Sequence, residues 1–236
     1  MPDWKALGDE AVEIARHYLR IDTTNPPGNE APAAAFLSEV LAGAGVAATV
    51  VESAPGRASL VARLPGREGR GLALLHHLDV VPADPAEWSV DPFGAEIAGG
   101  YLWGRGAIDM KGIGVMQLMS FLTLARQRVP LDRDVVFVAV ADEEAGGEMG
   151  AGFLAARHPD LVACTEVINE GGYGLTDTRP PLMAAALSEK AVFWLRVVAR
   201  GTPGHGSMPP DDSAVVKLVD ALHDLATRPP ALRVTP

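Results

Sequence analysis

The chain has 236 residues, 48% of them hydrophobic, which is enough to build the core of one or two domains. It carries 30 acidic and 20 basic residues, a net charge of −10, with no basic stripe, so nucleic acid is not an expected partner. No run approaches the roughly 18 to 20 apolar residues of a membrane span, and no membrane partner is expected. The single cysteine, Cys164, excludes an intrachain disulfide and suits a cytoplasmic protein.

The first part of the chain alternates helical and strand patterns. Residues 2–20 place apolar side chains at helical spacing between charges, which predicts an amphipathic surface helix and not a secretory signal. Residues 29–44 predict a second helix, and residues 47–52 and 58–64 predict a pair of strands. Helices that alternate with apolar strands indicate an α/β architecture.

A third apolar run, residues 71–75, predicts a buried strand that leads towards His77 and Asp79. Zinc prefers imidazole nitrogen and carboxylate oxygen, so His77 is a candidate ligand. In an extended chain Asp79, two positions on, lies on the same side as His77. We therefore expect the Asp79 carboxylate to accept the second imidazole N–H and to fix the tautomer of the ligand.

Asp109 stands in a glycine-rich loop, residues 104–112, before a helical pattern over residues 113–126. A carboxylate there can bridge two metal ions, which two-metal sites hold roughly 3.5 to 4 Å apart. The glycines permit backbone shapes that bring the loop close to the metals. They could also indicate a nucleotide-binding loop. The chain has neither the GxxxxGK[ST] pattern nor a strand immediately before the loop, so the metal interpretation is favoured.

Two further strand patterns end in carboxylates. Residues 134–141 predict a strand that runs into Glu143 and Glu144, and residues 166–172 contain a short strand that ends near Glu170. Adjacent residues at a strand end point in opposite directions, so we expect the two neighbouring glutamates to have different roles. Glu144 and Glu170 are assigned to metals. Glu143 is assigned as the general base that takes a proton from a bridging water and passes it to the leaving amine.

Each of these features alone is most often a solvated surface group. Together they place several carboxylates and a histidine at the carboxyl ends of apolar strands or in the loops beyond them. Open α/β sheets bind their ligands at that edge. The set is therefore what a two-metal hydrolase needs.

Seven blocks of the sequence, in this order, resemble the dizinc metallopeptidase family of aminoacylase, acetylornithine deacetylase, succinyl-diaminopimelate desuccinylase and glutamate carboxypeptidase. They are residues 23–30, 76–82, Trp88 with 92–93, 104–112, 142–147, 169–171 and 204–207. The resemblance covers essentially the whole chain. It implies a three-layer α/β zinc-peptidase domain with a central mixed sheet, followed by the start of an α+β lid and dimerisation domain.

The resemblance also implies an activity and two ligand sets. The family hydrolyses amide bonds of N-acyl amino acids or small peptides, as a deacylase or exopeptidase, with two zinc ions for which cobalt or manganese could substitute. One zinc would be held by His77, Asp109 and Glu170. The other would be held by Asp109, Glu144 and a histidine near the family's C-terminus. The peptide bond after the bridging aspartate, Asp109, would be cis.

The same resemblance predicts how the chain divides. Residues 1–186 would form the N-terminal part of a discontinuous catalytic domain, and residues 187–236 would begin the lid, with a strand at 191–200 and a helix at 211–227. After His205 the only histidine is His223, within that helix, so the second zinc would lack its histidine. We therefore expect the chain to be truncated partway through the inserted domain.

His205 lies in the block of residues 204–207. In the family this histidine reaches across a homodimer, formed through the lid, and donates to the tetrahedral oxyanion of the partner's substrate. The leading hypothesis is thus a zinc-dependent amidohydrolase with Glu143, Asp79 and His205 as catalytic residues. The alternative is a truncated, inactive fragment or pseudoenzyme that retains partial metal binding.

Overall fold

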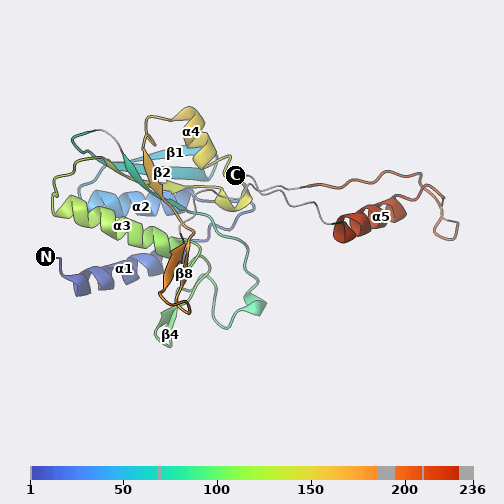
Figure 1. Ribbon diagram of the computed structural model, residues 1–236, viewed down its shortest axis with the longest axis horizontal. Coiled ribbons are helices and arrows are strands. Elements are labelled where there is room, and N and C mark those ends of the chain that lie inside the picture. The colour runs from blue at the N-terminus through green and yellow to red at the C-terminus, as the bar shows by residue number, and fades with distance from the viewer. Residues whose placement is uncertain (1, 69–70, 185–194, 209, 229–236) are drawn as a thin grey trace. The chain divides into compact units, whose positions relative to one another are not determined.

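The computed structural model describes residues 2–68, 71–184, 195–208 and 210–228 (Figure 1). The chain divides into two compact units, Met1–Leu187 and Ser188–Pro236, which are described separately. Assignment of these regions to a catalytic domain and a lid remains a prediction. In the described residues, no helix is both long enough and apolar enough to cross a membrane.

The first unit is an α/β domain around one mixed sheet. Its helices are α1 (Trp4–Leu19), α2 (Ala31–Gly43), α3 (Lys111–Arg126) and α4 (Ala151–Arg157), with 3₁₀ turns at Pro85–Glu87 and Glu143–Ala145. Its strands are β1 (Ala48–Ala54), β2 (Arg57–Leu64), β3 (Leu72–His77), β4 (Ile97–Ala98), β5 (Tyr101–Leu102), β6 (Val135–Val140), β7 (Glu166–Ile168), β8 (Tyr173–Leu175) and β9 (Leu182–Ala184).

The central sheet has five strands in the order β1-β2-β6-β3-β7. The β1-β2 and β2-β6 pairs are antiparallel, whereas β3 is parallel to both β6 and β7. The expected α/β class with a central mixed sheet is confirmed. His77 pairs with Val140 in the parallel register, so β3 and β6 end at the same edge of the sheet.

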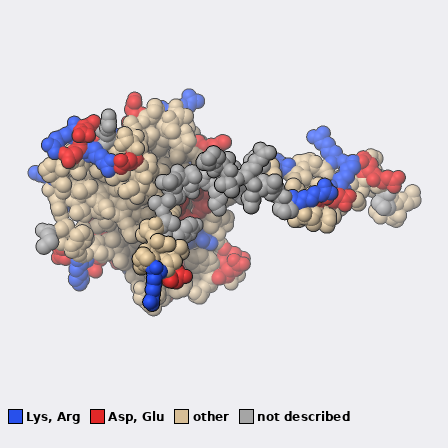
Figure 2. All heavy atoms as spheres, in the orientation of Figure 1, with Lys and Arg blue, Asp and Glu red and all other residues tan. Residues whose placement is uncertain are grey.

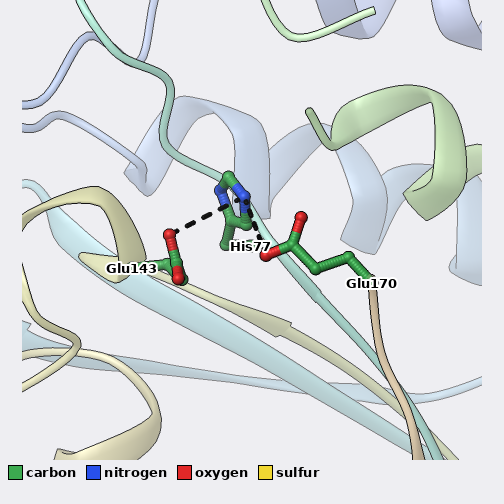
Figure 3. A group of neighbouring side chains, drawn as sticks. All are labelled: His77, Glu143 and Glu170. Atoms are coloured by element: carbon green, nitrogen blue, oxygen red, sulfur yellow. Dashed lines mark ion pairs between the residues drawn. The ribbon is translucent and has the colours of Figure 1, made fainter. Parts of the chain in front are cut away.

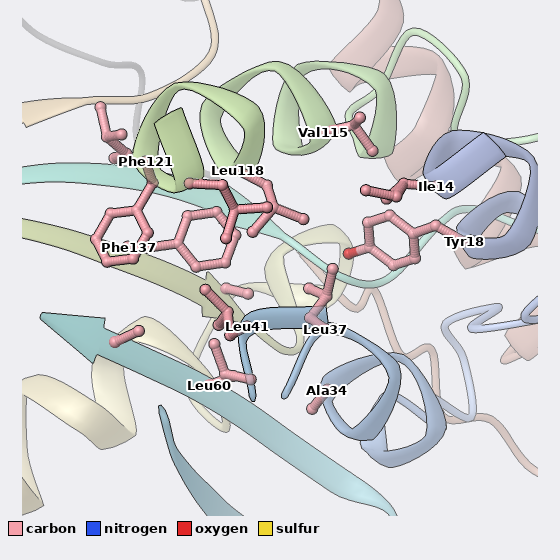
Figure 4. Close-up of a cluster of buried hydrophobic side chains, with 14 of the residues drawn as sticks. Ile14, Tyr18, Ala34, Leu37, Leu41, Leu60, Val115, Leu118, Phe121 and Phe137 are labelled. Carbon is pink, nitrogen blue, oxygen red and sulfur yellow. The ribbon is translucent and has the colours of Figure 1, made fainter. Parts of the chain in front are cut away.

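The two faces of the sheet are buried in separate layers. Along β6, Phe137 and Ala139 pack into a cluster with α1, α2 and α3, whereas Val136 and Val138 pack on the opposite face with Leu154 of α4. This alternation is the period of two that a strand imposes on its side chains. Every residue of β6 is buried because helices cover both faces of the sheet (Figures 1 and 4).

Local sequence explains where several elements begin. Asp3 caps α1, since its carboxylate accepts hydrogen bonds from the backbone N–H groups of Lys5 and Ala6, both at 3.1 Å. Pro32 stands in the first turn of α2, where its missing N–H removes no helical hydrogen bond.

Charged side chains of both signs are scattered over the visible face of the first unit (Figure 2).

The second unit contains α5 (Ala214–Thr227), close to the helix predicted at 211–227. A strand was predicted at residues 191–200. Residues 191–194 lie outside the described residues, and residues 195–200 form no strand, so that part of the prediction is wrong. A strand needs a hydrogen-bonded neighbour, and none pairs with this segment in the described part of the second unit.

Gly114 of α3 allows the helix to approach the sheet. A Cβ at this position would overlap the ring of His76, which is fully buried and packs against Tyr18 and Phe137. A hydrogen atom is therefore the only side chain that fits without moving the ring.

We expect Gly114→Ala to lower the free energy of unfolding by about 1–3 kcal/mol, the usual cost of overpacking. The matched control is Gly8→Ala in α1, where a Cβ meets nothing within 4 Å and alanine should stabilise the helix by about 0.5–1 kcal/mol. Urea unfolding of both variants measures the difference. Equal stability of the two variants would contradict the close approach.

Candidate metal centre

In the first unit, the predicted ligands Asp109 and Glu170 and the predicted general base Glu143 lie around one imidazole nitrogen of His77. Nε2 of His77 lies 2.9 Å from Asp109 Oδ1, 3.8 Å from Glu170 Oε1 and 4.0 Å from Glu143 Oε2. The end of β3, the segments that follow β6 and β7, and the loop that precedes α3 bring these groups together. Figure 3 shows the side chains of Glu143 and Glu170 directed at the buried ring of His77.

The donor atoms form two overlapping groups that could each hold a metal ion. One group is His77, Glu143 and Glu170, and the other is His77, Asp109 and Glu144; within each group the donor atoms lie within 4.8 Å of one another. Both groups share His77. In the predicted sets Asp109 and Glu170 bind the same ion, whereas these two groups separate them. The assignment of each carboxylate to an ion therefore remains a prediction.

The cluster has more negative charge than its surroundings balance. Burial, together with the nearby Asp109 and Glu143 carboxylates, raises the pKa of Glu170 to about 7 although His77 opposes this. Burial and Asp109 also raise the pKa of Glu144. A divalent cation would relieve this repulsion.

The same carboxylates stabilise the protonated form of the His77 imidazole. Burial lowers the pKa of His77, but the carboxylates of Asp79, Asp109 and Glu170 outweigh burial and raise it to about 9. One imidazole nitrogen with several carboxylate oxygens is a donor set that suits zinc, cobalt or manganese. The residues therefore fit the metal ions that the resemblance implies.

The orientation of His77 is set by backbone. Nδ1 lies 2.9 Å from the main-chain carbonyl oxygen of Asp79 and 3.5 Å from its Oδ1. We expected the carboxylate to accept this N–H, but β3 ends at His77 and the chain turns, which brings the carbonyl closer. A proton on Nδ1 that is donated to this carbonyl leaves Nε2 to face the carboxylates.

The Asp79 carboxylate instead holds the backbone of the two glutamates. It accepts hydrogen bonds from the N–H groups of Glu143 at 3.0 Å and Glu144 at 3.1 Å. Glu143–Ala145 forms a 3₁₀ turn after Asp142, whose φ is +69°. Strand alternation, from which we predicted different roles for the two glutamates, therefore does not apply to them.

A buried polar network supports this turn. Asn25 Nδ2 donates to Asp79 Oδ2 at 2.8 Å, and Arg57 Nη2 donates to Asp142 Oδ1 at 2.7 Å. Arg57 also binds both oxygens of Glu30, at 2.7 and 2.8 Å. Sequence reasoning missed Arg57, and its one signal was a charged residue at the start of an apolar strand pattern.

The loop of Asp109 is anchored from the other side. The Asp109–Met110 peptide bond is cis, as the resemblance implied, and the Met110 side chain is fully buried. Lys111 is also buried, and its Nζ donates to the carbonyl oxygen of Ile21 at 2.7 Å and lies over the ring of Tyr18. This lysine, which the sequence analysis did not single out, ties the start of α3 to the end of α1.

A largely apolar pocket of about 430 Å³ adjoins Asp109. Its walls include Trp88, Tyr101, Trp103 and Ile108. The indole N–H of Trp103 is already donated to the carbonyl oxygen of Ala98 at 3.1 Å, so this ring offers the pocket its apolar atoms.

His205 belongs to the second unit. Its Nδ1 lies 2.9 Å from the hydroxyl oxygen of Ser207, and the residue is exposed. His223 lies on α5 and is also exposed. The role of His205 as an oxyanion donor remains a prediction.

Comparison with known proteins gives consistent matches. The model of "Peptidase family M20/M25/M40" matches residues 73–232. Aminoacylase-1 of Sus scrofa is 34% identical over 220 residues, 91% of this chain and 53% of that protein. Aminoacylase-1 of Homo sapiens is 34% identical over 213 residues, 88% of this chain and 51% of that protein. The chain thus spans about half the length of these curated relatives.

Solved structures agree on the fold. The M20 family metallo-carboxypeptidase Sso-CP2 from Sulfolobus solfataricus matches with a TM-score of 0.60 and 26% identity, over 70% of this chain and 38% of that one. A Bacillus subtilis protein described as a dinuclear metal-binding peptidase of the M20 family matches with a TM-score of 0.52 and 17% identity, over 70% of this chain and 43% of that one. At 17% identity, the second match supports the fold alone.

We expect Asp79→Asn to disturb the turn of Glu143 and Glu144. Asparagine keeps the shape of aspartate, but its NH₂ group would face a donor where a carboxylate oxygen now accepts. The free energy of unfolding should fall by about 1–3 kcal/mol. Zinc affinity should fall about 10 to 100-fold, as is typical when a group that orients ligands is lost.

Asp91→Asn is the matched control for this substitution. Asp91 is exposed, and its carboxylate accepts from the backbone N–H of Phe93 at 2.9 Å, a bond that asparagine can replace. Urea unfolding and zinc titration should leave this control within about 0.5 kcal/mol of the wild type. An Asp79→Asn protein that matches the control on both readings would show that the carboxylate does not hold the turn.

Proposed function

Because this chain belongs to peptidase family M20/M25/M40, we propose that it acts as a zinc-dependent hydrolase of amide bonds in N-acyl amino acids or small peptides. The observation that carries the proposal is the surrounding of His77 Nε2 by carboxylate oxygens of Asp109, Glu170 and Glu143, all within 4.0 Å. Such a donor set, at the carboxyl ends of parallel strands, suits metal-assisted hydrolysis.

The residues would divide the work as follows. His77, Asp109, Glu144 and Glu170 would hold two metal ions, and the bound ions would polarise the amide carbonyl and activate the attacking water. Glu143 would accept the proton of that water and pass it to the nitrogen of the leaving amine. Its side chain is about half exposed, at 49%, so a substrate can reach it from solvent.

The apolar pocket beside Asp109 would bind the part of the substrate that is attached to the amide carbonyl. An amide carbonyl at the metal ions would lie next to the pocket, because Asp109 contributes to both. The group attached to that carbonyl would then lie against Trp88, Trp103 and Ile108. This supports an apolar acyl group as one half of the substrate, in keeping with the aminoacylase names of the relatives.

Three further expectations belong to the same proposal. His205 would donate to the oxyanion of a partner's substrate in a homodimer formed through residues 187–236. Zinc would be the native metal, with cobalt or manganese as substitutes. The protein would work in the cytoplasm, for which the single cysteine is the supporting observation.

A second candidate function is metal binding without turnover. Both candidate metal groups in the described residues depend on the same histidine, His77, and the imidazole presents one nitrogen to them. One ion would then lack an imidazole ligand. Zinc stoichiometry, measured together with activity on a panel of N-acyl amino acids, separates the two candidates.

We expect one zinc ion to bind more tightly than a second, because the two groups share the single Nε2 of His77. His77→Ala should weaken the tighter site by far more than the 10 to 100-fold typical of residues that only orient ligands. Competition titration with a zinc chelator measures this, and His223→Ala on α5 is the control. Two equally tight sites, or an unchanged affinity in His77→Ala, would contradict the expectation.

We expect the two adjacent glutamates to respond differently. Glu143→Gln should lower the rate of hydrolysis by about 10² to 10⁴-fold with zinc content unchanged, as removal of a general base does. Glu144→Gln should lose zinc as well. Metal analysis and initial rates measure both, with exposed Glu148→Gln as the control. Zinc loss in Glu143→Gln would instead make Glu143 a ligand, as its place beside His77 and Glu170 permits.

A further inference from the structure

The strand that carries Glu170 into the site is short, and in the described part of the chain it is the last strand of the five-stranded sheet. Among the described residues β7 pairs with β3 alone, and their register ends at Leu74 opposite Ile168. All three residues of β7 are exposed. The chain then leaves the sheet and turns at Gly171 and Gly172, which both have positive φ. An exposed edge strand of this length is weakly held by its own ladder.

One buried side chain joins the two strands where their ladder ends. Gln117 of α3 is 6% exposed, and its Nε2 donates to the carbonyl oxygen of Leu75 at 2.9 Å and to that of Ile168 at 3.3 Å. Leu75 is the first residue of β3 beyond its register with β7, and Ile168 is the last residue of β7. A side-chain amide therefore supplies the donors that bind both strands at this point.

Each of the two carbonyl groups belongs to a residue that precedes a candidate metal ligand by the same number of positions. Leu75 is two residues before His77, and Ile168 is two residues before Glu170. Only a group with two N–H donors on one nitrogen can bind both carbonyls in this way, which an amide provides and a carboxylate or thioether does not. Since α3 begins at Lys111, two residues after Asp109, the helix that carries Gln117 also follows the loop of the third ligand.

We propose that Gln117 is a positioning residue, which sets the carboxylate of Glu170 against Nε2 of His77 by binding β7 to β3. It touches no metal or substrate itself. Without its amide, the carbonyls of Leu75 and Ile168 lose their donor, and the end of β7 separates from β3. The part of this inference that concerns metal affinity rests on the proposed function.

The first test needs no metal. Gln117→Met keeps the length and volume of the side chain and removes both N–H groups. Hydrogen–deuterium exchange of the full chain should become faster in residues 166–172 and stay unchanged in β2 and β6. The control is Gln127→Met at the exposed end of α3, which should leave the exchange of the whole chain unchanged. Exchange at wild-type rates in residues 166–172 of Gln117→Met would overturn the proposal.

The second test measures zinc affinity by competition titration. Gln117→Met should bind zinc about 10 to 100-fold more weakly than the wild type, and Gln127→Met should bind it equally well. In a Glu170→Gln background the same substitution should change affinity by no more than about twofold, because its effect passes through Glu170. A full further loss in that background would show that Gln117 acts elsewhere and would overturn the proposal.

Two outcomes keep the inference separate from the proposed function. A wild-type chain that binds no zinc, cobalt or manganese would refute the proposed function, while the exchange of residues 166–172 would still decide the role of Gln117. If Gln117→Met does not fold, Gln117→Leu, which is apolar, smaller and without N–H donors, takes its place. It should show the same local exchange and the same loss of affinity.

Discussion

The buried guanidinium of Arg57 is the interaction on which the site depends. It binds both oxygens of Glu30 and one oxygen of Asp142 in a region where these side chains are at most 10% exposed. Burial of charge is costly, and only complete, well-directed hydrogen bonds offset the cost. The network joins α2, β2 and the end of β6. It therefore holds Asp142 in the left-handed conformation from which the turn of Glu143 and Glu144 begins.

The Asp79 carboxylate and main-chain groups support the cluster more directly than Arg57 does, and they leave Glu143, Glu144 and Glu170 free to face the metal site. Asp79 accepts the N–H groups of Glu143 and Glu144, and its own carbonyl orients His77. Asn25 then holds the Asp79 carboxylate. The side chains of Asp79 and Asn25 are themselves buried, at 0% and 3% exposed. The backbone segments that carry the ligands are held rigidly, and the carboxylate groups of the ligands remain partly exposed. A metal centre requires this arrangement.

The cluster is electrostatically unfavourable by itself. Burial and like charge raise the pKa of Glu170 to about 7, and the two ligand groups compete for one imidazole. Such local conflicts are characteristic of functional sites, whose strain the remaining fold must offset. Here the offset comes from a sheet buried on both faces and from the network of Arg57. Binding of a cation would couple the stability of the loops after β3, β6 and β7 to the occupancy of the site.

The sequence by itself determined the longer helices and the central strands of the first unit and the residues that could bind metal, because apolar periodicity and ligand chemistry are local properties. His77, Asp109 and Glu170 were each recognisable from a few neighbouring residues. Tertiary structure alone decided how they group and what supports them. Arg57 reaches Asp142 across 85 residues of sequence, and Gln117 reaches Leu75 and Ile168 across 42 and 51. The turn at Glu143 replaced the expected strand end because Asp142 is held from outside its own segment. Hydrogen bonds between distant segments leave no periodic trace in a single sequence, so only the folded chain could reveal them.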